Sequence, residues 1–107
     1  MAMSKQKEYQ TEPDYQADLI KLLKRMFPGC IVLKNDSAYI QGIPDLTIFF
    51  KDKWAMLEVK RSENEPHQPN QDYYVDYSDH MSFGRFIYPE NQQSVLDALK
   101  GYFLRRP

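Results

Sequence analysis

Two apolar segments separated by three polar residues constrain the fold of this 107-residue chain more than any other feature. The segments are Leu46–Phe50 and Trp54–Val59, and Lys51-Asp52-Lys53 lies between them. Short runs rich in β-branched and aromatic residues on either side of a short polar turn are typical of a β-hairpin. We therefore predict two antiparallel strands joined by a tight turn.

The length of that turn decides which side chains face each other across the hairpin. A loop of two or of four residues gives the same register, and in that register Asp45 faces Glu58. Directly opposed residues have Cβ atoms about 4.5–5.5 Å apart, and like charges in such positions destabilise a sheet. A loop with an odd number of residues would instead put the two acids on opposite faces. An even loop therefore predicts two carboxylates side by side at the open end of the hairpin.

Helical and strand patterns surround the hairpin. Apolar residues at helical spacing, preceded by residues that cap or open helices, predict helices over residues 11–26, 69–80 and 91–103. Short β-branched or aromatic runs predict strands at residues 30–33 and 85–88. The order is α-β-β-β-α-β-α around one mixed sheet, which defines an α/β fold. We expect one domain over residues 11–107, after a flexible polar tail at residues 1–10.

The composition excludes several classes of protein. The chain has 14 Lys and Arg against 15 Asp and Glu, so a nucleic-acid partner would need a local basic surface. Cys30 is the single cysteine, which excludes a disulfide framework and fits a reducing compartment. The N-terminus lacks the apolar core of a signal peptide, and no run approaches the roughly 20 apolar residues of a membrane span. We expect a cytoplasmic protein without a membrane partner.

The opposed acids Asp45 and Glu58 predict a metal site. Lys60 shares the face of Glu58, because side chains alternate along a strand. Without a cation, one acid would raise the pKa of the other. A pair of hard oxygen ligands suits Mg²⁺ or Mn²⁺, and the backbone carbonyl of Val59 could supply a further oxygen. The alternative is structural: two acids at strand ends, ion-paired with Lys60 and Lys34.

Glu12 favours the metal over the structural alternative. It lies three residues before Tyr15 and seven before Leu19, on the inward stripe of the first helix. An acid in a first turn also stabilises a helix by about 0.3–1 kcal/mol through the helix dipole. Asp14 can already serve that purpose, so Glu12 is available as a third carboxylate at the site.

Four short motifs follow one another along the chain. The central two are Gly42-Ile43-Pro44-Asp45 and Glu58-Val59-Lys60-Arg61, and the flanking two are Glu12-Pro13-Asp14-Tyr15-Gln16 and Pro69-Asn70-Gln71. Together they resemble the PD-(D/E)XK nuclease core and, within it, the VRR-NUC branch of virus-type replication–repair nucleases. The resemblance extends from Glu12 to Tyr88. It implies a restriction-endonuclease-like core, and the element order derived from the residues agrees with it.

The resemblance also implies a chemistry, the Mg²⁺-dependent hydrolysis of phosphodiester bonds, with Mn²⁺ able to substitute. Asp45, Glu58 and the Val59 carbonyl would bind the metal. Glu12 would lie at the site and contact the metal through water or a second ion.

Two further residues have implied supporting roles. Lys60 would orient or help to activate the attacking water, and Gln71 would form a hydrogen bond near Glu58 or Lys60. Stand-alone members of the branch resemble homodimers that cleave branched DNA such as four-way junctions, and similar proteins occur in bacteriophages. The resemblance thus implies a homodimeric, structure-selective endonuclease in a bacterium or a phage-infected host cell.

Basic residues near the predicted site are candidates for binding DNA phosphates. They are Arg61, Lys34, Lys51 and Lys53. Lysines in a hairpin turn are more commonly just solvated, which weighs against Lys51 and Lys53.

Two other hypotheses stay open. A nuclease-fold module could bind DNA or protein without turnover, which the near-neutral charge favours, as does a loop (residues 37–41) without the Gly and Arg of relatives. A purely structural α/β domain is the other hypothesis, and divalent cations would not stabilise it.

Overall fold

The structure is a computed structural model and describes residues 8–105. Its elements are α1 (Glu12–Met26), β1 (Ile31–Lys34), β2 (Leu46–Phe50), β3 (Lys53–Val59), α2 (Gln71–Met81), β4 (Gly84–Ile87) and α3 (Gln92–Phe103). The order α-β-β-β-α-β-α and the α/β class confirm the prediction from the sequence. This architecture is compatible with a restriction-endonuclease-like core.

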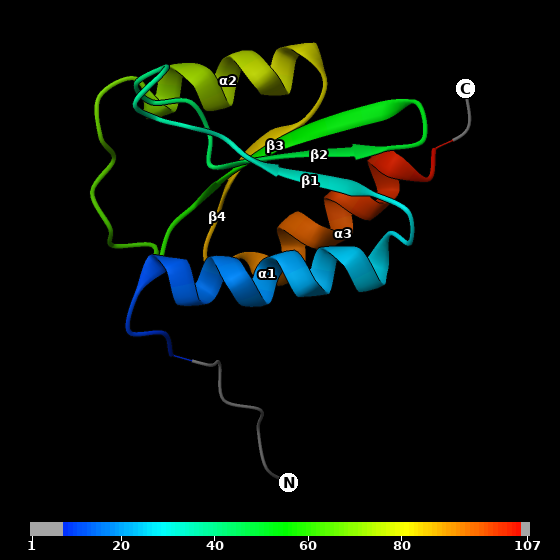
Figure 1. The fold of residues 1–107 in the computed structure, drawn as a ribbon, viewed down its shortest axis with the longest axis horizontal. Coiled ribbons are helices and arrows are strands. Elements are labelled where there is room, and N and C mark those ends of the chain that lie inside the picture. Colours follow the sequence, from blue (N-terminus) through cyan, green and yellow to red (C-terminus); the bar gives the residue numbers. More distant parts are fainter. Residues whose placement is uncertain (1–7, 106–107) are drawn as a thin grey trace, which may run out of the picture.

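The four strands form one mixed sheet in the order β1-β2-β3-β4. The pairs β1–β2 and β2–β3 are antiparallel, and β3–β4 is parallel. Parallel neighbours need a crossover connection, and α2 provides it. Figure 1 shows α2 on one face of the sheet and both α1 and α3 on the other.

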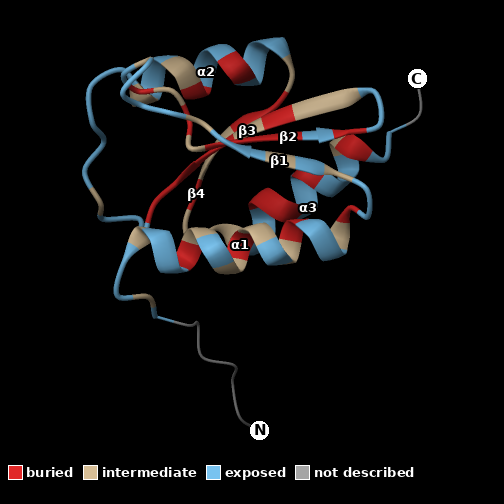
Figure 2. Ribbon diagram, in the orientation of Figure 1, coloured by how far each residue is buried: buried red, intermediate tan, exposed pale blue. Residues whose placement is uncertain are grey.

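The main core lies between the sheet and the pair α1 and α3. Side chains that α1 turns inward at helical spacing, such as Leu19 and Leu23, are at most 1% exposed. They pack with Ile48 and Leu57 of the central strands and with Leu99 of α3. Figure 2 shows these buried segments on the inner sides of the helices. Each such side chain contributes about 1.5–3 kcal/mol when it leaves water, so this layer holds the central hairpin rigidly.

The hairpin has the even loop that the metal hypothesis requires. Phe50 pairs with Lys53, which leaves the two residues Lys51-Asp52 in the turn. The same register, continued past the end of β2, places Asp45 opposite Glu58. The predicted pairing is therefore confirmed within the strands and leads directly to the two acids.

Several boundaries differ from the prediction. Helix α2 begins at Gln71 rather than at Pro69, because Asn70 takes a left-handed conformation with φ 71° and forms the N-cap. Asn91 is the N-cap of α3 as predicted, but its side chain does not cap the helix. Its Oδ1 accepts the Tyr88 N–H at 2.8 Å and its Nδ2 donates to the Phe86 carbonyl at 3.0 Å, so it fixes the end of β4 instead.

The segment just before the first helix contacts that helix. Residues 1–7 of the predicted tail lie outside the described residues. The Tyr9 ring packs on Tyr15 with a centroid separation of 4.9 Å, and its hydroxyl donates to Asp18 at 2.9 Å. Tyr9, which the sequence placed in the tail, thus contacts the first helix. Within the described part of the chain, no helix has the length and apolarity that crossing a membrane demands.

Candidate metal centre

Three carboxylates meet where α1, β2 and β3 begin or end. Glu12 is the first residue of α1, Asp45 directly precedes β2, and Glu58 is the penultimate residue of β3. One carboxylate oxygen from each residue lies within 4.8 Å of the other two. Glu58 is buried, whereas Glu12 and Asp45 are half-buried. The structure thus brings together the three acids that the sequence singled out, and they could hold a metal ion.

Hydrogen bonds from neighbouring strands position Asp45. The Asn35 N–H donates to the Asp45 carbonyl at 2.8 Å, and the Asn35 side-chain amide donates to Pro44 and to Thr47, also at 2.8 Å. Asp45 Oδ2 in turn accepts the Val59 N–H at 2.9 Å. The N–H and C=O groups of one strand residue point to the same side, so the Val59 carbonyl also faces Asp45. That orientation is the one its predicted role as a ligand requires.

Glu58 is the least satisfied residue of the site. Its side chain is only 2% exposed, and Oε2 accepts a hydrogen bond from Gln71 Nε2 at 3.0 Å. Oε1 is buried and finds no hydrogen-bond donor among the described residues. Buried polar atoms are nearly always paired, so a buried carboxylate oxygen without a donor, on a side chain that meets two other acids, fits a cation ligand.

The pKa values of the acids also favour a cation ligand at this site. Burial, and after it the negative charge of Asp45, raise the pKa of Glu58 to about 8, although the nearby Lys60 opposes the shift. Burial and Asp45 likewise raise the pKa of Glu12. The positive charge of a divalent cation would lower these pKa values again. Clusters of hard oxygen ligands suit Mg²⁺, Mn²⁺ or Ca²⁺.

Lys60 is buried beside the acids and held in one position. Its Nζ donates to Gln71 Oε1 at 2.7 Å and to the Pro66 carbonyl at 3.2 Å, and it lies 3.9 Å from Glu58 Oε2. The Gln71 amide therefore bridges Lys60 and Glu58. The predicted hydrogen bond of Gln71 near these residues is confirmed, and it reaches both of them.

The loop after β3 is held against the sheet by His67, the residue that follows Pro66. The His67 ring stacks on Phe86 with centroids 4.1 Å apart, and His67 Nδ1 lies 2.7 Å from Asp72 Oδ1. Phe86 is the β4 partner of Glu58, so this stack lies beside the site. The contacts fix the loop that supplies the carbonyl for Lys60.

Sequence reasoning missed Asn35 and Pro66 as supporting residues. Asn35 follows a strand in a segment with turn composition, where an asparagine is unremarkable. Pro66 acts through its backbone carbonyl, which every residue type possesses. Neither residue type signals its role, since both roles follow from the tertiary approach of distant segments.

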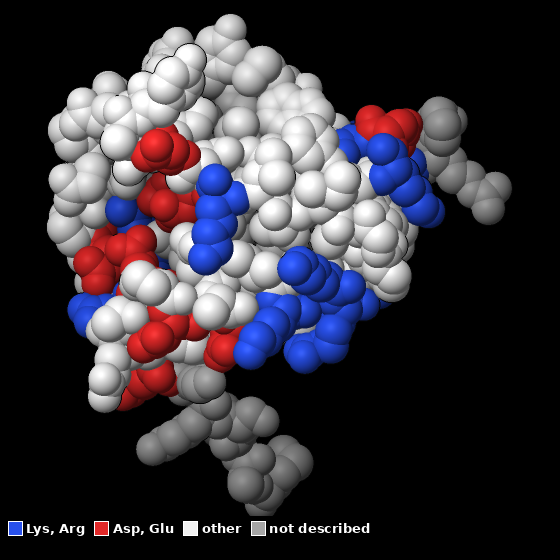
Figure 3. Space-filling view, in the orientation of Figure 1, with Lys and Arg blue, Asp and Glu red and all other residues white. Residues whose placement is uncertain are grey.

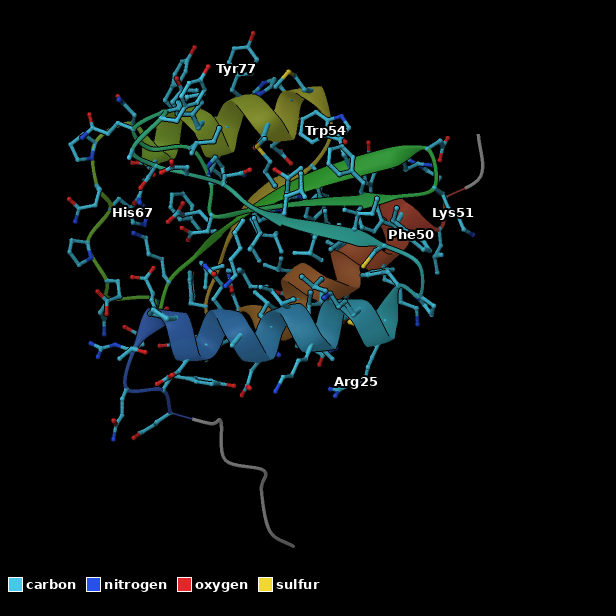
Figure 4. The ribbon with its side chains drawn as sticks, in the orientation of Figure 1. Arg25, Phe50, Lys51, Trp54, His67 and Tyr77 are labelled. Carbon is cyan, nitrogen blue, oxygen red and sulfur yellow. The ribbon has the colours of Figure 1, made fainter. Side chains whose placement is uncertain are left out.

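The four basic residues proposed for DNA binding do not gather at the site. Lys51 and Lys53 lie at the turn of the hairpin, about 17 Å or more from Glu58 at 3.3 Å per residue. Lys53 pairs with Asp52 at 3.1 Å and donates to the Arg105 carbonyl at 3.0 Å. Figure 4 shows Phe50 and Lys51 together at this turn.

Arg61 and Lys34 lie closer to the acids than the two turn lysines do. Arg61 adjoins Lys60, but its guanidinium is engaged by Glu65 at 3.0 Å and by the Gln10 carbonyl at 2.8 Å. Lys34 ends β1 next to Asn35 and is exposed. In Figure 3 the acidic side chains gather at one end of the visible face and most of the basic ones at the other. A role in DNA binding stays a prediction for all four residues.

Comparison of the chain with protein-family models, curated proteins and solved structures found no match. The fold and the site define an α/β protein with a candidate carboxylate metal centre. The resemblance to VRR-NUC nucleases, which was drawn from the four sequence motifs, stays a prediction.

Proposed function

We propose that this chain is a Mg²⁺-dependent endonuclease that hydrolyses phosphodiester bonds in DNA. One observation carries the proposal: Glu58, whose buried Oε1 has no hydrogen-bond donor among residues 8–105, meets two other carboxylates, with the ammonium group of Lys60 beside them. A purely structural domain has no use for such a cluster, because isolated buried charge destabilises the fold.

Glu12, Asp45 and Glu58 would hold the cation, joined by the Val59 carbonyl. Mg²⁺ fits this set of hard oxygen donors, and Mn²⁺ would substitute for it. When bound, such an ion acts as a Lewis acid on a phosphoryl oxygen and lowers the pKa of a coordinated water.

The chain's own contribution is a fixed positive charge and fixed ligands. Lys60 would donate a hydrogen bond to the attacking water or to a non-bridging phosphate oxygen. Because Gln71 and Pro66 already hold its Nζ, little reorganisation is needed during the reaction. Gln71 also fixes the Glu58 carboxylate, so it is a positioning residue for both groups.

The proposed substrate is branched DNA, such as a four-way junction, and the proposed assembly is a homodimer. The support is the order of the four motifs on the matching elements, from the start of α1 to the start of α2. Lys34 and Arg61 are the basic residues placed to meet DNA near the acids.

The test is cleavage of labelled four-way, flap and linear DNA in Mg²⁺, Mn²⁺ or chelator. Asp45→Asn and Lys60→Met should lower the rate by more than about 1,000-fold, because several kcal/mol of transition-state stabilisation is lost. Asp97→Asn, an exposed acid on α3, is the matched control and should cleave normally. Metal-dependent cleavage that survives both site changes would refute the proposal.

One observation favours a second candidate, a nuclease-fold module that binds DNA or protein without turnover. Arg61 and Lys53 are engaged within the molecule, and the four candidate basic residues do not form one phosphate-binding surface. Such a module would bind branched DNA or a protein while yielding no product in either Mg²⁺ or Mn²⁺. Product formation by the wild-type chain, lost in Asp45→Asn, excludes it.

A further inference from the structure

A groove opens between α2 and the loop that joins β1 to β2. Two adjoining hollows of about 410 and 340 Å³ form it, and Ile43 and Met56 line both of them. Cavities of about 300–1,000 Å³ are typical of small-molecule sites. The loop lines the first hollow with Asn35, Asp36, Tyr39 and Ile40. Helix α2 lines the second mainly with large side chains, among them Tyr73, Tyr74, Tyr77 and Met81. We call the two hollows together the aromatic groove.

The aromatic groove lies on the face of the sheet that carries the acids. Met56 and Glu58 are two residues apart on β3, so their side chains point to the same face about 6.6 Å apart along the strand. Asn35, which lines the first hollow, donates its N–H to the Asp45 carbonyl at 2.8 Å. A DNA strand with one phosphate at the acids would therefore bring its adjoining nucleotides to the groove.

The aromatic rings of the groove are largely open to solvent. Tyr39, Tyr73 and Tyr77 are 85%, 58% and 50% exposed. The Tyr73 ring contacts the rings of Tyr74 and Tyr77, with centroids 5.0 and 5.8 Å apart. Figure 4 shows Tyr77 projecting from α2. Tyrosines usually bury most of their large apolar surface, so a cluster of exposed rings marks a binding surface.

The charges around the groove favour nucleobases over the DNA backbone as its occupant. Within residues 8–105, no Lys or Arg lines the groove. Phosphates bind chiefly to Lys and Arg, and the negative charge of Asp36 in the first hollow would repel them. A base is uncharged and stacks on an aromatic ring through its π face. Lys34 is exposed and adjoins Asn35, so it is placed to hold the backbone outside the groove.

Only unpaired bases can enter a groove of this kind. In a duplex each base is stacked and paired, and proteins reach it only after it is extruded or the strand is single. Unpaired nucleotides meet this condition without the cost of opening a base pair. An apolar protein segment could also fill the groove, but it would gain nothing from the neighbouring acids.

We propose that the aromatic groove binds unpaired nucleobases beside the scissile phosphate, so that the preferred DNA has an unpaired strand at the cleavage site, as in a flap or a gap. The inference rests on the proposed nuclease function and narrows its substrate class. Tyr39, Tyr73 and Tyr77 would hold the bases while the metal centre binds the phosphate. A fully paired four-way junction must first open base pairs, so it should be a poorer substrate.

The first test measures base binding without cleavage. The probe is a flap DNA with 2-aminopurine, a fluorescent adenine analogue, in the unpaired strand next to the branch. Stacking on a ring quenches this fluorophore, and the full chain should quench it in chelator or in Ca²⁺, with gels to confirm that the strand stays intact. Tyr73→Leu combined with Tyr77→Leu should lose the quenching and weaken binding by at least about 10-fold.

Three matched variants separate stacking from other effects. Tyr73→Phe combined with Tyr77→Phe keeps the rings and should bind and quench like the wild type. Leu104→Ala, at an exposed leucine after α3, should also change neither. Tyr39→Leu, on the loop, should weaken binding several-fold and covers the case in which the double leucine variant does not fold. No quenching by the wild type, or equal quenching by the leucine and phenylalanine variants, would overturn the inference.

The second test compares cleavage rates on a flap, a fully paired four-way junction and a linear duplex in Mg²⁺. The wild type should cleave the flap at least about 10-fold faster than the fully paired DNAs, and the double leucine variant should lose this preference. Equal rates on flap and junction, or a preference that survives the tyrosine changes, would overturn the inference and leave the nuclease function intact. A wild type that quenches through its tyrosines but cleaves none of these DNAs would refute the proposed function and leave the groove as a site for unpaired bases.

Discussion

The two ends of the β2–β3 hairpin differ in how they manage charge. At the turn end, Asp52 and Lys53 pair at 3.1 Å, and Lys53 lowers the pKa of the Asp52 carboxyl. At the open end, burial and mutual repulsion raise the pKa of Glu58 to about 8. We call these the turn end and the acidic end.

The difference shows where the molecule tolerates unfavourable electrostatics. Water and a local partner solvate the charges of the turn end, and such surface pairs contribute little to stability. At the acidic end the core layer and Asn35 hold three acids together although they repel one another. Strain of this kind is retained where a ligand relieves it, which is why the acidic end is the candidate functional site.

The largest expected difference between the ends concerns pH. A raised pKa means that folded Glu58 keeps a proton that the unfolded chain releases above pH 4.5. Stability should therefore fall as pH rises from 5 to 8, by up to about 1.4 kcal/mol per pH unit. Glu58→Gln should flatten this slope and stabilise the chain at pH 8, as measured by urea unfolding in chelator. Asp52→Asn at the turn end should leave the slope unchanged, and identical slopes for the wild type and Glu58→Gln would contradict the prediction.

Two glycines permit a matched comparison of backbone packing. Gly42, before the acidic end, and Gly29, before β1, both have φ +89°. A Cβ at Gly42 would lie 2.5 Å from Asn70 Cβ, whereas a Cβ at Gly29 would meet nothing within 4 Å. Gly29→Ala should cost about 1 kcal/mol from backbone strain and Gly42→Ala about 3 kcal/mol, because steric overlap is added. Urea unfolding measures both, and equal losses would show that the packing of this loop on α2 is loose.

Removal of the amide that bridges Lys60 and Glu58 should have a moderate effect confined to the acidic end. Gln71→Ala should weaken Mn²⁺ binding by about 10–100-fold, as is typical for residues that orient metal ligands. Gln93→Ala, which removes an exposed glutamine on α3, is the matched control and should leave the affinity unchanged. Calorimetric titration with Mn²⁺ distinguishes the two, and unchanged affinity in Gln71→Ala would remove this residue from the site.

The smallest effect is expected at the turn end. Lys51→Ala should change the free energy of unfolding by less than about 0.5 kcal/mol, because its side chain is exposed and its ammonium group lies over the Phe50 ring at the surface. Mn²⁺ affinity should not change, given the distance from the acids. A measurable loss of metal binding would show that the two ends are coupled through the hairpin.

Much of the fold was predictable from local patterns. Thr11 accepts the Asp14 N–H at 3.2 Å as the expected N-cap, and the even hairpin loop set the register that points to the two acids. The exposure of the tyrosines on α2 was not predictable in this way. Tyr73 and Tyr77 are 58% and 50% exposed, because α2 covers only half of its face of the sheet.

The residues of the candidate site were likewise predictable only in part. Glu12, Asp45, Glu58 and Lys60 were identified because strand alternation and helical spacing fix the face on which each side chain lies. The partners of Arg61 were not predictable, since Glu65 and Gln10 approach it only after the loop and the N-terminal segment have packed. A charged side chain at the surface has several possible partners, and spacing along the sequence does not tell which of them it binds.

By itself the sequence determined the order of the elements and the even number of residues in the hairpin loop, because backbone periodicity is a local property of the chain. The loop length in turn determined which acids lie side by side at the end of the hairpin. Only the tertiary structure decided, for the residues it describes, that Glu58 Oε1 is buried without a donor, that Gln71 bridges Lys60 and Glu58, and that β1 is an edge strand. Burial and hydrogen-bond satisfaction depend on every segment that packs around a group, and these segments come together only when the whole chain has folded.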